Sequence, residues 1–128
     1  MNVPDDRRYT KDHEWARIDG RQVWVGITDH AQSALGDIVY VELPQVGAEV
    51  AANDAFSEVE STKSVSDVYA PLPGTVVEVN RKLADAPQEL NEDPYGAGWI
   101  CVLEVADDSG YQTLLSAEAY RELIAEEQ

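Results

Sequence analysis

The sequence predicts a mainly β fold, a flattened barrel or sandwich of short strands with one short helix and one C-terminal helix. Three observations predict it. Short segments alternate between apolar and polar residues, turn-forming residues separate most of these segments, and helical periodicity occurs in only two places. At 128 residues, 44% of them hydrophobic, the chain is expected to form one domain. We expect its core over residues 9–106 and a helical tail over 107–128.

The first elements are a hairpin and a helix. Residues 14–27 alternate around Asp19-Gly20, and an Asp-Gly pair between alternating runs favours a tight hairpin turn. A short helix follows near 28–35. Thr28 is expected to cap its first turn, and Gly36 is expected to end it in a left-handed conformation.

Three later strands and a terminal helix complete the expected elements. The strands are predicted at 38–43, 75–79 and 99–105, where apolar and β-branched residues lie between turn signals. The helix is predicted at 117–126, with Ser116 as its cap. Its apolar residues, at helical spacing, are Tyr120, Leu123 and Ile124. This stripe is expected to pack against the β body.

The chain is strongly acidic, with 25 acidic and 9 basic residues and a net charge of −16. This charge argues against nucleic acid and anionic membranes as partners. It suits partners with basic docking surfaces, although solubility explains it equally well. Its only cysteine, Cys101, cannot form an internal disulfide, and neither a signal peptide nor a membrane-spanning stretch is recognisable. We therefore expect a cytoplasmic protein.

Lys63 is the most informative residue. Strand-like residues lead into and out of the polar group Ser61-Thr-Lys-Ser64, which is the pattern of a hairpin with a lysine at its tip. Water keeps the amine of an exposed lysine charged, so such a lysine is a poor general base. It is well placed to be recognised by a modifying enzyme and to carry a covalent group.

Patterns typical of an enzyme or a metal site are weak in this sequence. His13 and His30 have no recognisable ligand spacing, and structural or docking roles are the better interpretation. We predict no metal site and no catalytic residue. Trp15, Trp24 and Trp99 are expected to anchor the core.

The residues around Lys63 resemble the biotinyl/lipoyl carrier domains. In that superfamily a glycine-led turn precedes the modified lysine by 16 residues, and Ala-Pro and then Gly follow it. Here Gly47 lies 16 residues before Lys63, and Ala70, Pro71 and Gly74 lie 7, 8 and 11 residues after it. The glycines permit the sharp corners that bring the two halves of such a domain together.

Within that superfamily the chain is similar to glycine cleavage system H proteins. Biotin carriers read Met-Lys-Met at the lysine and 2-oxoacid dehydrogenase domains usually read Asp-Lys-Ala, whereas H proteins read Glu-Ser-x-Lys and then alanine or serine. The matching segments are Glu60-Ser-Thr-Lys-Ser64, Tyr9-Thr-Lys-Asp-His-Glu-Trp15, Val25-Gly-Ile-Thr-Asp-His-Ala-Gln32, Leu35-Gly-Asp-Ile-Val-Tyr-Val-Glu-Leu-Pro44 and Asn91-x-Asp-Pro-Tyr-Gly-x-Gly-Trp99. The resemblance therefore runs from about residue 9 to the terminal helix and implies a single lipoyl-carrier domain.

The resemblance implies a carrier and not a catalyst. (R)-lipoate would be attached to Lys63 through an amide. The carrier would take the aminomethyl group of glycine from the pyridoxal-phosphate-dependent glycine decarboxylase (P protein) to the tetrahydrofolate-dependent aminomethyltransferase (T protein). Dihydrolipoamide dehydrogenase (L protein) would then reoxidise the dithiol, and lipoylating enzymes would be further partners.

The resemblance also implies roles for acidic residues. The loaded arm folds back into a surface cleft in this family, and by position Asp12, Glu14 and Asp67 would shield its amine. The alternative for Glu14 and Asp67 is an ordinary surface acid, and Asp12 could instead cap a turn. Glu58 and Glu60 could help the lipoylating enzyme to recognise the hairpin, or could be solvated strand charges.

Three other functions compete with this one. The chain could be an H-like protein that chiefly relays lipoyl groups, and the genes beside its own would distinguish this role. It could be a β-sandwich interaction domain with an unmodified Lys63, which would carry no added mass. An independent enzyme is disfavoured because neither a nucleophile–base pair nor a metal set is visible in the sequence.

Overall fold

The computed structural model describes residues 1–127. Its strands are β1 (Arg8–Tyr9), β2 (Glu14–Asp19), β3 (Gln22–Ile27), β4 (Ile38–Glu42), β5 (Glu49–Val50), β6 (Ala55–Ser61), β7 (Val65–Tyr69), β8 (Gly74–Val79) and β9 (Cys101–Glu104). Its helices are α1 (Asp29–Leu35), α2 (Glu89–Glu92), α3 (Ser109–Gln112) and α4 (Ala117–Glu126), with a 3₁₀ turn η1 (Arg81–Ala84). In this part of the chain, no helix combines the length and the apolar character that a membrane crossing requires.

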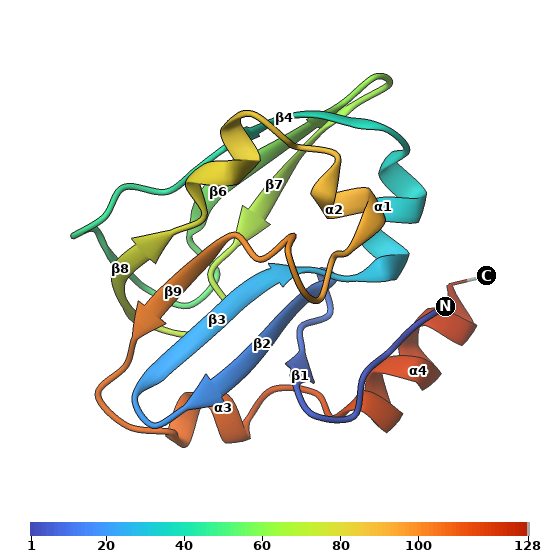
Figure 1. Ribbon diagram of the computed structural model, residues 1–128. Helices are drawn as coiled ribbons and strands as arrows, with labels where there is room; N and C mark the ends of the chain where they lie inside the picture. The colour runs from blue at the N-terminus through green and yellow to red at the C-terminus, as the bar shows by residue number, and fades with distance from the viewer. Residues whose placement is uncertain (128) are drawn as a thin grey trace.

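The strands form two antiparallel sheets (Figure 1). One has six strands in the order β1-β2-β3-β9-β8-β5, and the other has three in the order β4-β6-β7. The mainly β prediction is confirmed. The sheets stay separate, so the fold takes the sandwich form of that prediction and does not close into a barrel.

The predicted β2–β3 hairpin is confirmed. Asp19 pairs with Gln22, and Gly20 has a φ of 64°, which a residue without a Cβ adopts without strain. Close packing also explains the glycine on the next strand. A Cβ at Gly26 would lie 2.7 Å from the indole ring of Trp15, so only glycine lets this ring lie flat against β3.

Both predicted helices begin at the expected caps. The Thr28 hydroxyl accepts a hydrogen bond from the Ala31 amide at 3.2 Å, and the Ser116 hydroxyl accepts one from Ala119 at 3.1 Å. Gly36 ends α1 with φ 83° and ψ −155°. This φ is positive, as predicted, but the ψ lies outside the left-handed helical region, in backbone space that is open almost only to glycine.

Two hydrophobic clusters hold the fold together. The larger one fills the space between the sheets and includes Val25, Val59, Leu72 and Leu103. The smaller one seats α4 on β1 and β2, where Tyr9 and Tyr120 stack at 4.6 Å between ring centroids. The predicted packing of α4 on the β body is therefore confirmed. The chain's first residues run along α4 (Figure 1).

The structure differs from the sequence-based expectations at several points. The last strand is shorter than 99–105, and β1, β5, α2 and α3 were not predicted. Trp15 is buried as expected, whereas Trp24 and Trp99 are only partly buried against the smaller cluster. The Arg17 guanidinium covers the Trp24 ring at 4.8 Å, which lets an aromatic ring remain near the surface.

Candidate functional site

Lys63 is exposed at the tip of the β6–β7 hairpin, as predicted. Glu60 and Val65 form the last strand pair, and the Ser61 amide donates to the Ser64 carbonyl across the turn at 2.8 Å. The Ser61 hydroxyl accepts hydrogen bonds from the backbone amides of Lys63 and Ser64, at 3.3 and 3.1 Å. Ser61 is buried, so this side chain closes the turn from inside and holds the Lys63 backbone in place.

A second set of contacts braces the tip against the end of α1. The Thr62 amide donates to the Asp37 carbonyl at 3.1 Å, and the Lys63 Cε would be 3.5 Å from a Cβ at Gly36. Asn91 in turn holds this segment, because its side chain donates to the Gly36 carbonyl and accepts from the Ile38 amide. In Figure 1 the segment that joins α1 to β4 passes beside the β6–β7 hairpin, and the hairpin tip projects beyond it.

The turn makes a testable prediction. We expect Ser61→Ala to leave the two amides of the turn without an acceptor and to destabilise the tip by about 1–3 kcal/mol. Faster amide hydrogen exchange at Lys63 and Ser64 would report this loosening, with exchange in β2 and β3 unchanged. Ser64→Ala is the matched control, because the Ser64 side chain is exposed and forms no hydrogen bond among residues 1–127. Equal exchange in both variants would contradict the role of Ser61.

A groove of about 500 Å³ lies between α1 and the start of β7. Its lining residues are Asp12, His13, His30, Ala31, Ala34, Leu35, Ser66 and Glu127. Ser66 follows the hairpin tip by three residues, and Leu35 directly precedes Gly36, beside which the Lys63 side chain lies. The groove therefore begins close to Lys63. Its lining includes apolar side chains, such as Leu35, and carboxylates, such as that of Asp12.

Two histidines from distant segments meet on the wall of this groove. The rings of His13 and His30 lie 4.5 Å apart between centroids, and both Nε2 atoms approach the same carboxylate oxygen of Glu127, at 3.1 and 3.5 Å. The Tyr120 hydroxyl is 2.7 Å from His13 Nδ1. Burial lowers the pKa of His13, although the neighbouring Glu127 opposes this effect. The sequence spacing did not predict this cluster.

Glu14 is buried, so the interpretation of this residue as an ordinary surface acid is wrong. Its carboxylate accepts hydrogen bonds from the Thr10 hydroxyl at 2.6 Å and the Tyr69 amide at 3.2 Å. The bond from Tyr69 joins β2 of one sheet to β7 of the other, whereas the bond from Thr10 is local. Burial raises the pKa of Glu14 to about 7 and outweighs the two hydrogen bonds, which lower it. Glu14 is not among the residues that line the groove.

The remaining predicted acids lie on the outer face of the three-stranded sheet. Asp67 pairs with Glu58, and Glu58 pairs with Glu42 on the other side, so three carboxylates form one row across the strands. Glu60 lies in the next row, between Tyr40 and Val65, both about half exposed. Like charges opposite one another destabilise a sheet, so fold stability does not explain this row.

Of the three predicted shielding residues, only Asp12 lines the groove; Asp67 lines a separate hollow with Glu58.

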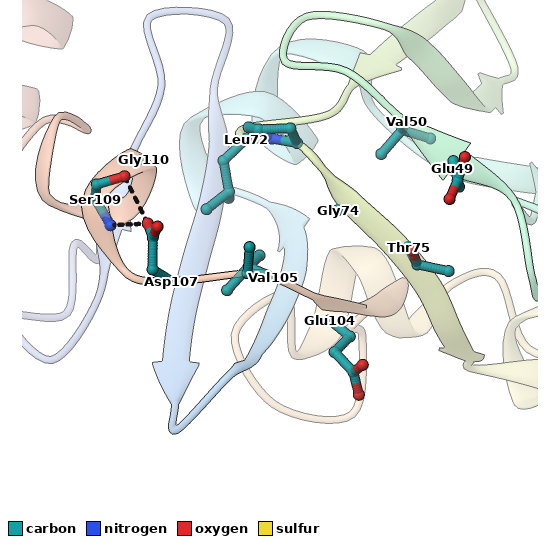
Figure 2. Close-up of a pocket in the computed structure, with 12 residues that line it drawn as sticks. Glu49, Val50, Leu72, Gly74, Thr75, Glu104, Val105, Asp107, Ser109 and Gly110 are labelled. Carbon is teal, nitrogen blue, oxygen red and sulfur yellow. Dashed lines mark hydrogen bonds between the residues drawn. The ribbon is translucent and has the colours of Figure 1, made fainter.

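A second hollow of similar size, about 540 Å³, lies at the far end of β7 and β8 from the tip (Figure 2). Its wall contains Leu72, Gly74, Val105 and Asp107. Asp107 accepts hydrogen bonds from the amide and hydroxyl of Ser109, so this carboxylate is already engaged in closing the loop before α3. The hollow contains none of the predicted site residues.

Comparisons with known proteins agree with this arrangement. The family model described as "Glycine cleavage H-protein" matches residues 7–127. A glycine cleavage system H protein of Geobacillus kaustophilus (strain HTA426) is 56% identical over 126 residues, covering 98% of this chain and 99% of that protein. The one from Bacillus subtilis (strain 168) is 50% identical over 127 residues, covering 99% of this chain and 100% of that protein.

The structure leads to the same family. The crystal structure of a glycine cleavage system H protein from Mycobacterium marinum superimposes with a TM-score of 0.89 at 44% sequence identity, covering 96% of this chain and 99% of that one. A hairpin-tip lysine beside a groove is the arrangement that a covalent carrier needs. The chain therefore belongs to the glycine cleavage H-protein family and is a lipoyl carrier of the glycine cleavage system, not a catalyst in itself.

Proposed function

We propose that Lys63 is the residue of this carrier that holds (R)-lipoate, in amide linkage to its Nζ. The observation that carries the proposal is the exposed tip, where Ser61 holds the lysine backbone and leaves the amine accessible. Among residues 1–127 no carboxylate forms an ion pair with Lys63, so acylation of its amine breaks no internal contact. The site therefore suits a covalent arm.

The lipoyl group, when bound, supplies the disulfide that accepts the glycine-derived one-carbon unit and its electrons. This chain supplies the attachment point and a place for the arm to rest. The groove beside the tip is within the usual size range of small-molecule sites, and Ala34 and Leu35 provide the apolar wall that an alkyl chain prefers. Asp12 and Ser66 provide polar contacts on the same wall.

Asp12 and Glu14 suit a cargo that carries an amine. Asp12 lines the groove, and Glu14 lies two residues further along the same segment. Burial raises the pKa of Glu14 to about 7, so this acid can change its protonation near neutral pH, but its carboxylate does not line the groove and could act on an ammonium there only from within the protein. Asp12 is therefore the carboxylate of the two that can meet the cationic cargo directly.

The shielding role predicts a difference between two acids. We expect Asp12→Asn to shorten the lifetime of the glycine-derived cargo on the isolated loaded protein by up to roughly five-fold, since Asp12 is exposed and an exposed ion pair contributes about 1 kcal/mol at most. Asp67→Asn is the comparison, because Asp67 belongs to the other hollow. The rate at which each loaded variant releases the one-carbon unit measures the lifetime of its cargo. A longer-lived cargo in Asp12→Asn than in Asp67→Asn would contradict the assignment of the groove and would favour Asp67.

The partners that we propose are glycine decarboxylase, the aminomethyltransferase, dihydrolipoamide dehydrogenase and the lipoylating enzymes, all in the cytoplasm. The outer face of the three-stranded sheet supports docking near the tip. It presents the acidic row of Glu42, Glu58 and Asp67 together with Glu60, beside the exposed side chains of Tyr40 and Val65. Basic residues around a partner's active site would pair with this row, and the apolar side chains would be covered. Glu58 and Glu60 are our candidates for recognition by the lipoylating enzyme.

Peptide mass spectrometry of protein from its native source tests the attachment site. We expect the mass of a lipoyl or octanoyl amide on the peptide that contains Lys63. Peptides containing Lys11 and Lys82, the only other lysines, should be unmodified. An unmodified Lys63 in cells that make lipoate would refute the attachment site.

A further inference from the structure

We propose that His13, His30 and Glu127 form a binding site for a divalent transition metal of the zinc class. Among residues 1–127 this is the group of histidine, cysteine and acidic residues whose ligand atoms converge, all within 4.8 Å of one another. The three residues come from the segment before β2, from α1 and from the residue that follows α4. The inference goes beyond the carrier role and does not depend on the arm.

The distances match the edges of a metal tetrahedron. Zinc bonds of about 2.0–2.1 Å to nitrogen and oxygen place neighbouring ligand atoms about 3.3 Å apart. The Glu127 Oε2 atom lies 3.1 Å from His13 Nε2 and 3.5 Å from His30 Nε2. The two distances from Glu127 to the histidines are therefore already close to the length that a tetrahedral site requires. The third, between the two imidazoles, is at most 4.8 Å and would need a rotation of one ring to shorten it.

His30 is the ring that can rotate. Its Nδ1 atom is buried and has no hydrogen-bond partner in the described part of the chain. With no hydrogen bond to break at Nδ1, a turn about the last side-chain torsion costs little and brings the imidazole toward the ion.

His13 is held in the orientation that a metal ligand requires. The Tyr120 hydroxyl lies 2.7 Å from His13 Nδ1 and 2.7 Å from the Thr28 hydroxyl. If His13 Nδ1–H donates to Tyr120, and Tyr120 donates to Thr28, the lone pair of Nε2 faces Glu127. Partners of this kind orient the histidine ligands of known metal sites. His13 also has a φ of 72°, a conformation uncommon for residues other than glycine, and its ring contacts that of His30 on α1.

The ligand set selects the class of metal. Two imidazoles and one carboxylate suit Zn²⁺ and its neighbours, whereas Mg²⁺ and Ca²⁺ prefer oxygen ligands only. Three protein ligands leave one coordination position free, as in zinc sites that exchange a ligand. All three residues line the groove, so the ion is reachable from solvent. An ion here would also tie α4 to α1 and to the segment before β2.

The test is a Zn²⁺ titration of the full chain without a histidine tag, in competition with a chromophoric chelator. The background is Lys63→Arg, so that no lipoyl sulfur can bind the ion and a failure of the carrier assignment cannot affect the result. We expect one Zn²⁺ per chain, no competition by excess Mg²⁺, and a rise in Tm on zinc addition. Co²⁺ should give the absorption bands of a tetrahedral site.

Two variants and one matched control locate the ion. Glu127→Gln and His30→Gln should each weaken Zn²⁺ binding by roughly ten-fold or more and remove the rise in Tm. Glu126→Gln, an exposed acid one residue away at the end of α4, should bind as the parent does. Glu127 is exposed, so its variant tests the site even if His30→Gln folds poorly. The proposal would be overturned by any of three results. These are no Zn²⁺ binding, weak binding of several Zn²⁺ ions per chain that Mg²⁺ displaces, and equal Zn²⁺ affinity in Glu127→Gln and Glu126→Gln.

Discussion

Replacing Lys63 by arginine is expected to abolish carrier activity completely and to leave the fold intact. Arginine keeps the positive charge and most of the length of lysine, but its guanidinium is not acylated in place of the amine. The Lys63 side chain is exposed at a hairpin tip, so we expect a change of less than about 0.5 kcal/mol in the free energy of unfolding. Glycine–bicarbonate exchange with the partner decarboxylase measures the activity, and chemical denaturation measures the stability.

The other two lysines are matched controls for this variant. Lys11 and Lys82 are exposed, and their replacement by arginine should preserve both glycine exchange and the mass of the attached group. Residual exchange in Lys63→Arg above the background without carrier would place the attachment elsewhere. Loss of exchange together with unfolding would show that the fold needs the Lys63 side chain, and would contradict its place at an exposed turn.

Glu14 is expected to make the protein less stable as the pH rises from about 4.5 to about 7. Burial raises the pKa of Glu14 from 4.5 to about 7, so in this window the native protein holds a proton that the unfolded chain has released. The stabilisation is fully present below pH 4.5 and is lost as the pH rises through 7. The shift corresponds to about 3 kcal/mol at most. Glu14→Gln keeps the size of the side chain and removes the titration.

The measurement is the difference in free energy of unfolding between wild type and Glu14→Gln at pH 5 and at pH 8. Other titrating groups, such as His13, cancel in this difference. From pH 5 to pH 8, we expect the free energy of unfolding of the variant to rise relative to that of the wild type by up to about 3 kcal/mol. Glu122→Gln, on the exposed face of α4, is the matched control for the loss of a carboxylate outside the core. A constant difference for Glu14→Gln would contradict the raised pKa.

Local signals in the sequence predicted the elements whose geometry is encoded within a few residues. The Asp19-Gly20 turn, the Thr28 and Ser116 caps and the Lys63 hairpin were all found in the expected places. Each depends on side chains that bond to their own backbone or on a glycine that tolerates a positive φ. The short strands β1 and β5 carry no such signal, because two residues become a strand only when a neighbouring strand pairs with them.

The positioning residues of the site were harder to predict. Asn91 belongs to a segment that resembles the H proteins. Its side chain bonds to Gly36 and Ile38, which lie more than 50 positions earlier in the chain, so no local pattern predicts this contact. Ser61 had a local signal, since a serine at the start of a tight turn commonly accepts hydrogen bonds from the amides that follow. Because Ser61 lies within the motif around Lys63, we assigned it to the motif and did not predict its structural role.

By itself the sequence determined the family, the mainly β sandwich and the exposed lysine at a hairpin tip, because motif spacing and turn chemistry act over short stretches of chain. Only the tertiary structure decided which charged and polar side chains share a space. It buried Glu14 between the two sheets, separated Asp67 from the groove that Asp12 lines, and brought Glu127 to His13 and His30. These outcomes depend on how two sheets and the last helix pack together, and desolvation and long-range contacts of this kind leave no periodic pattern in the chain.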